Sequence, residues 1–90
     1  MEREVFTPVG FQQIVGAVAS TALTVPLGAQ YALIQVEGAN VRWRDDGTAP
    51  TTTVGMRIIS GGDMWYSSPL ARLRFIQESA TATINVSYYG

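Results

Sequence analysis

The stretch VRWRDDGTAPTTTVG, residues 41–55, decides the fold that the sequence predicts. Its first four residues alternate in polarity, so on a strand Val41 and Trp43 lie on one face and Arg42 and Arg44 on the other. A shift of one residue would exchange Trp43 for an arginine, and the register of this strand is therefore strongly specified. The stretch predicts well-ordered β-structure and contains no residues arranged for catalysis, which favours a structural or binding role.

Turn-forming residues recur along the chain on both sides of this stretch. The segments between them are about five to nine residues long, as in sandwiches and barrels of short antiparallel strands. The turn signals are Pro8-Val9-Gly10, Pro26-Leu27-Gly28, Glu37-Gly38-Ala39-Asn40, Asp45-Asp46-Gly47, Gly61-Gly62-Asp63 and Ser67-Ser68-Pro69. We expect strands over residues 11–18, 20–25, 30–37, 40–45, 54–60, 63–67, 71–77 and 81–89. The predicted fold is all-β, a compact antiparallel β-sandwich of about eight short strands.

The length of 90 residues suits one domain. We expect an N-terminal arm over residues 1–10 and a single β-sandwich domain over residues 11–90. Met1 to Phe6 precede the first turn signal, and we expect their order to depend on a neighbouring molecule. In the last strand Ala82, Ile84, Val86 and Tyr88 point to one face, which predicts a core-facing side.

The composition excludes several kinds of chemistry. The chain contains no cysteine, no histidine and no lysine, which removes thiolate and imidazole metal ligands, the usual general base and Schiff-base chemistry. We therefore expect no enzyme activity, no cofactor and no metal. The net charge of −1 disfavours binding to nucleic acid or to an anionic membrane. No targeting or membrane-spanning segment is evident, which predicts synthesis in the cytoplasm.

The acidic residues of the opening stretch are candidates for acid/base catalysis or for a calcium site. Asp45 and Asp46 are adjacent, so on a strand they would point apart, and Asp-Gly is an ordinary turn sequence. Asp63 follows two glycines and is interpreted in the same way. We interpret these acids as turn-forming residues, with calcium as the weaker alternative.

Two Arg-x-Arg pairs are the first candidate interface. Arg42 with Arg44, and Arg72 with Arg74, would each place two guanidinium groups about 7 Å apart on one strand face. Such pairs are best tolerated near carboxylates. They can be solvated, can form salt bridges between subunits or, less in keeping with the net charge, can contact nucleic acid.

The consecutive aromatic residues Trp65 and Tyr66 are the second candidate interface. On a strand one of the two must face outward, where it could fill a partner's pocket, stack on a sugar or be only partly buried. Trp43 is expected in the core. Phe6, in the expected arm, completes the candidate interface residues.

Three stretches of the chain resemble the small virion structural proteins of tailed bacteriophages, of the capsid decoration (cement) type. They are VRWRDDGTAPTTTVG at 41–55, the GGD turn at 61–63 and LRFIQESATATINVSYYG at 73–90, together about half of the chain. The resemblance implies a β-sandwich, often jelly-roll-like, that works as an oligomer on a repeating lattice. It supplies no catalytic residues.

The expected function is therefore that of a capsid decoration protein that binds the outer surface of the phage head and stabilises it. Its expected partners are further copies of itself, as a trimer or dimer, and the major capsid protein. Two alternatives stay open: a glycan-binding module of a tail fibre or spike, and a structural component of the tail tube or connector.

Overall fold

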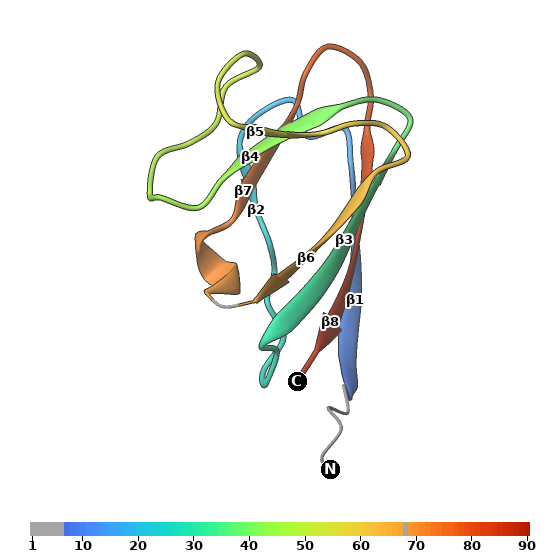
Figure 1. The fold of residues 1–90 in the computed structure, drawn as a ribbon, viewed down its shortest axis with the longest axis vertical. Helices are drawn as coiled ribbons and strands as arrows, with labels where there is room; N and C mark the ends of the chain where they lie inside the picture. Colours follow the sequence, from blue (N-terminus) through green and yellow to red (C-terminus); the bar gives the residue numbers. More distant parts are fainter. Residues whose placement is uncertain (1–6, 68) are drawn as a thin grey trace.

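The structure, a computed structural model, describes residues 7–67 and 69–90. Within these residues eight strands form two antiparallel four-stranded sheets, and one short 3₁₀ helix lies in the connection between the sixth and seventh strands (Figure 1). The elements are β1 (Pro8–Val15), β2 (Thr21–Ala22), β3 (Tyr31–Glu37), β4 (Val41–Arg44), β5 (Met56–Ile58), β6 (Asp63–Ser67), η1 (Leu70–Arg72), β7 (Arg74–Gln77) and β8 (Thr83–Tyr89). The predicted all-β sandwich of about eight short strands is confirmed.

The order of the strands follows one simple rule. Sheet A has the order β1-β8-β3-β6, and sheet B has the order β2-β7-β4-β5. The first strand thus pairs with the last, the second with the seventh, the third with the sixth and the fourth with the fifth. The strands therefore pair as they would in one long hairpin of eight strands. Two of the four pairs lie in sheet A and the other two in sheet B.

The core lies between the sheets and is supplied mainly by their central strands. On β8 the predicted alternation is confirmed, because Ala82 just before the strand and Ile84, Val86 and Tyr88 within it are all buried. The other fully buried large side chains are Ile34, Val36, Val41, Leu73 and Phe75. All of them except Leu73, which lies between η1 and β7, belong to central strands, whose inner faces are shielded by neighbours on both sides and by the opposite sheet.

Strand β4 shows the alternation that its sequence predicts. Val41 is buried opposite Ile58 of β5, and Trp43 lies opposite Phe75 of β7 on the same inner face. Trp43 is only partly buried, because its other neighbour is β5, an edge strand of three residues. It packs against the core cluster rather than within it.

Residues 7–10, which were predicted to belong to an N-terminal arm, are part of the sandwich. β1 begins at Pro8, and Thr7 and Gly90 exchange backbone hydrogen bonds of 3.3 and 2.9 Å, so residues 7–10 belong to the sandwich. Pro8 was predicted to mark a turn, but it is the first residue of the edge strand β1. Proline is tolerated there because the backbone N–H that it lacks is not needed to pair with a neighbouring strand. The pairing of β1 with β8 is irregular at this point, with a register shift between Pro8 and Gly10. Phe6 and the rest of residues 1–6 lie outside the described residues.

The expected strand over residues 71–77 is shorter than predicted. Its first part is η1, after which β7 begins at Arg74. Leu70 and Leu73 are three residues apart and both buried, a spacing that one turn of 3₁₀ helix places on a single side. The prediction that Arg72 and Arg74 share a strand face is therefore wrong.

Candidate interaction faces

The outer face of sheet B carries four arginines, which we call the arginine face. They are Arg42 and Arg44 of β4, Arg57 of β5 and Arg74 of β7. Arg42 is paired across the strands with Arg57, and Arg44 with Arg74. Like charges directly opposite one another destabilise a sheet, so this face needs compensating acids.

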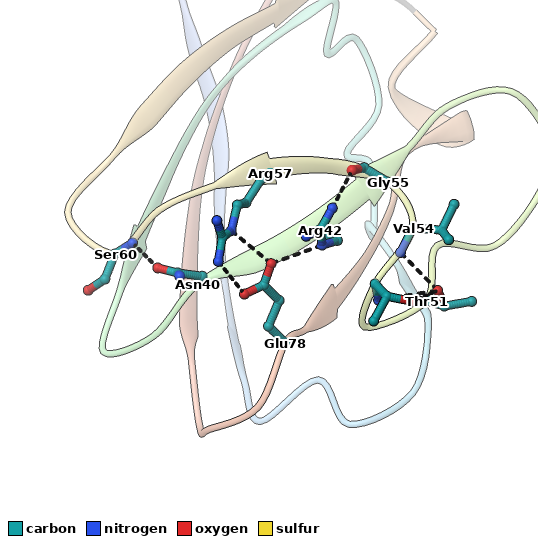
Figure 2. Close-up of polar contacts among 9 residues, drawn as sticks. Asn40, Arg42, Thr51, Val54, Gly55, Arg57, Ser60 and Glu78 are labelled. Carbon is teal, nitrogen blue, oxygen red and sulfur yellow. Dashed lines mark hydrogen bonds and ion pairs between the residues drawn. The ribbon is translucent and has the colours of Figure 1, made fainter.

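Glu78, just after β7, compensates the first pair (Figure 2). Its Oε2 accepts from Nε of Arg42 at 2.9 Å and lies 2.8 Å from Nε of Arg57, while its Oε1 accepts from Nη2 of Arg57 at 3.0 Å. The Glu78 side chain is only 13% exposed. The hydrogen bond from Arg57, followed by the charges of both arginines, holds the pKa of Glu78 below its usual value. Arg42 also donates to the carbonyl of Gly55 at 3.0 Å, so its guanidinium is occupied within the chain.

We expect Glu78→Gln to lower the stability of the chain at neutral pH, because two arginines lose one shared carboxylate. The folded pKa of Glu78 lies below its unfolded value, so its contribution is present above the unfolded value and is lost as the pH falls through the folded pKa. Urea unfolding of both proteins from about pH 7 to about pH 3 should show a difference that shrinks toward acid. A difference that stays constant over this range would contradict the pairing.

Arg44 pairs locally with Asp46. Its Nε and Nη2 donate to the two carboxylate oxygens of Asp46 at 3.0 and 2.5 Å, and Oδ1 of Asp46 also accepts from the backbone N–H of Thr48 at 3.4 Å. The hydrogen bond raises the pKa of Arg44 and lowers that of Asp46. The predicted turn role of Asp46 agrees with this geometry. Among residues 7–67 and 69–90 no three potential acidic or sulfur ligands lie close enough together to hold a metal ion.

Arg72 and Arg74 lie at the end of the arginine face and have no carboxylate partner among the described residues. Arg72 Nε donates to the backbone carbonyl of Asp45 at 3.0 Å, and Arg74 Nη1 donates to the carbonyls of Ala71 and Leu73 at 3.2 and 3.5 Å. In the described part of the chain neither arginine takes part in an ion pair. Both arginines line a surface hollow of about 200 Å³. Because neither forms an ion pair with a described residue, this end of sheet B carries positive charge.

The outer face of sheet A has the opposite character, and we call it the aromatic face. Phe11 of β1, Leu33 of β3 and Trp65 of β6 lie in one row across the sheet, with Ser87 of β8 between the first two. Phe11 is 67% exposed and Trp65 55% exposed. In the adjacent row Tyr31 pairs with Tyr89, and the rings of Trp65 and Tyr89 lie 5.6 Å apart between centroids.

The other end of the aromatic face carries both acids of this face and is mostly polar, although Val15 of β1 is exposed there. Gln35 lies between Asn85 and Asp63, and Glu37 follows two residues later on β3. Asn85 donates to Glu37 at 2.9 Å and accepts from Gln13 at 2.8 Å. Glu37 and Asp63 are exposed. The face therefore combines an apolar half with a half that carries negative charge.

Of the consecutive aromatic pair, Trp65 faces outward and Tyr66 inward. The Tyr66 ring meets Trp43 edge-on, with 6.0 Å between centroids, and its hydroxyl donates to Oδ2 of Asp45 at 2.5 Å. Burial, and next the hydrogen bond to Asp45, raise the pKa of Tyr66 to about 12. Tyr66 thus anchors the β4–β5 connection to sheet A, and Asp45 acts as its acceptor.

We expect Tyr66→Phe to cost about 1 kcal/mol of stability, because it removes this hydrogen bond while keeping the ring in place. Asp45→Asn weakens the same contact, so the effects of the two substitutions should be less than additive in the double variant. Chemical denaturation of the four proteins measures this coupling. Fully additive effects would show that the hydroxyl and the carboxylate do not interact in solution.

Charge is segregated between the two sides of the sandwich. Sheet B and its flanking segments hold five arginines against three acids, Asp45, Asp46 and Glu78, which leaves two positive charges. The outer face of sheet A holds two acids, Glu37 and Asp63, and no cation among the described residues. The described part of the chain is thus neutral overall but positive on one side and negative on the other.

The structure separates the predicted interface residues into three groups. Arg42, Arg44 and Arg74 share the arginine face, with Arg72 beside it on η1, and Trp65 lies on the opposite face of the molecule. Tyr66 points inward, and Phe6 lies outside the described residues. The sequence reasoning missed Phe11, Tyr31, Leu33, Tyr89 and Arg57. The one sequence signal for the missed residues of the aromatic face is the run of apolar residues on both faces of 31–34, a pattern that is also typical of a central strand.

Comparison of the chain with protein-family models, with curated proteins and with solved structures gives no match. In the part of the chain that the structure describes, no helix is long and apolar enough to cross a membrane. The geometry of the two faces therefore carries the functional argument.

Proposed function

We propose that the chain is a structural protein of a tailed-bacteriophage virion, of the capsid decoration type, which binds the outer surface of the head and stabilises it. The observation that carries this proposal is the pair of outer faces, one aromatic and acidic and the other rich in arginine. A protein that belongs to a lattice must contact neighbours on more than one side, and two chemically distinct faces suit such a position.

The strand order supports the jelly-roll form of the sandwich that the resemblance implies. Pairing of first with last and second with seventh strand is the order produced when one long hairpin rolls into two four-stranded sheets. Jelly rolls of eight strands are common in viral capsid and lectin domains. This likeness concerns architecture, and the chemistry of the faces is what favours a structural role.

The acids nearest to the arginines support a role in interaction rather than catalysis. Asp45 accepts from Tyr66, Asp46 from Arg44, and Glu78 from Arg42 and Arg57. Each of these carboxylates is held in a contact that stabilises the sandwich. The proposed role needs no catalytic group.

Quantitative mass spectrometry of purified virions tests the proposal. A decoration protein should be present in a copy number comparable to that of the major capsid protein, and antibody labelling should decorate the head. A few copies per particle, or label confined to the tail, would remove the decoration role.

A second candidate, a glycan-binding module of a tail fibre or spike, is favoured by one observation. Trp65 and Tyr31 line a surface hollow of about 380 Å³, and planar polar side chains such as Gln35 and Asn85 lie on the same face. Aromatic rings beside polar groups suit the apolar and hydroxylated faces of sugars. A glycan array probed with the chain and with Trp65→Ala tests this. Binding that depends on Trp65 would support the second candidate, and its absence would remove that candidate.

A further inference from the structure

We propose that copies of the chain associate head to tail, with the aromatic face of one copy covering the arginine face of the next. The inference rests on the proposed structural role, in which neighbouring copies make contact, and it identifies the two surfaces that meet. The partner that covers each face is a second copy of this chain, because one molecule carries both the aromatic face and the arginine face, which are complementary.

The charges favour this pairing of faces. The aromatic face holds Glu37 and Asp63 without a cation among the described residues, and the opposite side of the molecule has two arginines in excess of its acids. Among the described residues Arg72 and Arg74 donate hydrogen bonds only to backbone carbonyls and form no ion pair, so each can pair with an incoming carboxylate without breaking one. Opposite charges of this kind set the register and partner of an interface.

The apolar half of the aromatic face adds a second complementarity. Phe11 and Trp65 are more than half exposed, and Trp65 lies next to Tyr89. Guanidinium groups stack on tryptophan and tyrosine rings, and they do so better than lysine ammonium groups. Aromatic residues and arginine are also the residue types that dominate the energetics of interfaces. If the arginine face of one copy lies on the apolar half of the aromatic face of another, guanidinium groups can stack on these rings.

Association of like faces is disfavoured by the same charges. Two aromatic faces packed together would bring the acids of both copies to one interface, and two arginine faces would bring eight arginines together. Like-charge contacts across an interface are costly. A contact between unlike faces is heterologous, so it closes into a ring or extends into a filament.

Two charge reversals, one on each face, test the inference. Asp63→Arg alters the aromatic face at an exposed position of β6, and Arg74→Glu alters the arginine face while placing a carboxylate opposite Arg44. Thr52→Arg and Thr52→Glu are matched controls, because Thr52 is exposed in the β4–β5 connection and belongs to neither face. Circular dichroism and thermal unfolding first establish that each variant is folded. Sedimentation velocity of the full chain then measures association.

The expected result has three parts. The wild-type chain and both controls associate in a manner that depends on concentration and weakens with salt. Each reversal alone weakens association by about a hundredfold. An equimolar mixture of the two reversed variants recovers association, because one intact face of each kind remains and the two reversed faces are again opposite in charge.

Three results would overturn the inference. The first is a wild-type chain that stays monomeric up to about 0.5 mM. The second is a single reversal that still associates like the wild type, which indicates contact between like faces. The third is a mixture of folded monomeric variants that forms no complex. Because the purified chain is tested without a capsid, these outcomes are independent of the copy number in virions, so the two proposals can fail separately.

Discussion

Replacement of Phe75 by alanine is expected to lower the free energy of unfolding by about 3–5 kcal/mol, the largest effect that we expect from one substitution. Phe75 is fully buried on β7, a central strand of sheet B, between Thr21 of β2 and Trp43 of β4. Truncation removes the burial of the ring and leaves a cavity that the two sheets cannot close. Domains of this size are typically stable by about 5–13 kcal/mol, so the loss is a large part of the total.

Thermal and urea denaturation measure this effect, with an expected fall of about 15–30 °C in the unfolding midpoint. Phe75→Leu, which keeps most of the volume, should cost about 1–1.5 kcal/mol. Ile59→Ala is an exposed control in the loop after β5 and should change stability by less than about 0.5 kcal/mol. If Phe75→Ala cost no more than Ile59→Ala, the assignment of Phe75 to the core would be wrong.

Gly55→Ala is expected to cost about 3 kcal/mol, although it adds only one methyl group. Gly55 ends the β4–β5 connection with a φ of +142°, a conformation that residues with a side chain rarely adopt. A Cβ there would lie 3.1 Å from the carbonyl oxygen of Trp43 and 3.2 Å from Cβ of Pro50. The connection cannot move away easily, because the backbone N–H of Val54 donates to Oγ1 of Thr51 at 3.0 Å just before Gly55 (Figure 2), and the two residues also exchange backbone hydrogen bonds.

Gly61→Ala is the matched control for this prediction. Gly61 also has a positive φ, +88°, but nothing lies within 4 Å of the position that a Cβ would take. Gly61→Ala should therefore lower the free energy of unfolding only through the unfavourable backbone conformation, by about 1–2 kcal/mol. Urea denaturation of both variants separates strain from steric contact. Equal losses from the two substitutions would show that Gly55 does not approach β4 closely.

The fold could be predicted largely because several strands have one buried face. The alternation of Val41 with Arg42 and of Ile84 with Asn85 identified β4 and β8, and turn residues marked the connections. The ends of strands were less predictable. Pro8 and Gly10 have turn character but lie in an edge strand, and Leu70 and Leu73 form one turn of 3₁₀ helix because the core takes both side chains.

The faces could be predicted only in part, because they depend on which strands become neighbours. Arg42 and Trp65 were recognisable from their alternation, but sharing of Glu78 between Arg42 and Arg57 requires β4 and β5 to pair beside β7. The aromatic face likewise requires β1 to pair with β8, which brings Phe11 into the same row as Leu33 and Trp65. Contacts between residues so far apart in the sequence have no local signal.

We propose that the chain is a structural protein whose two outer faces are covered by other proteins in a virion. Cryo-electron microscopy of purified virions tests it most directly. We expect density for the sandwich at regular positions on the outer surface of the head, with both the aromatic face and the arginine face in contact with neighbouring subunits. Heads that lack this density, or a sandwich at a tail fibre with the aromatic face open to solvent, would contradict the claim.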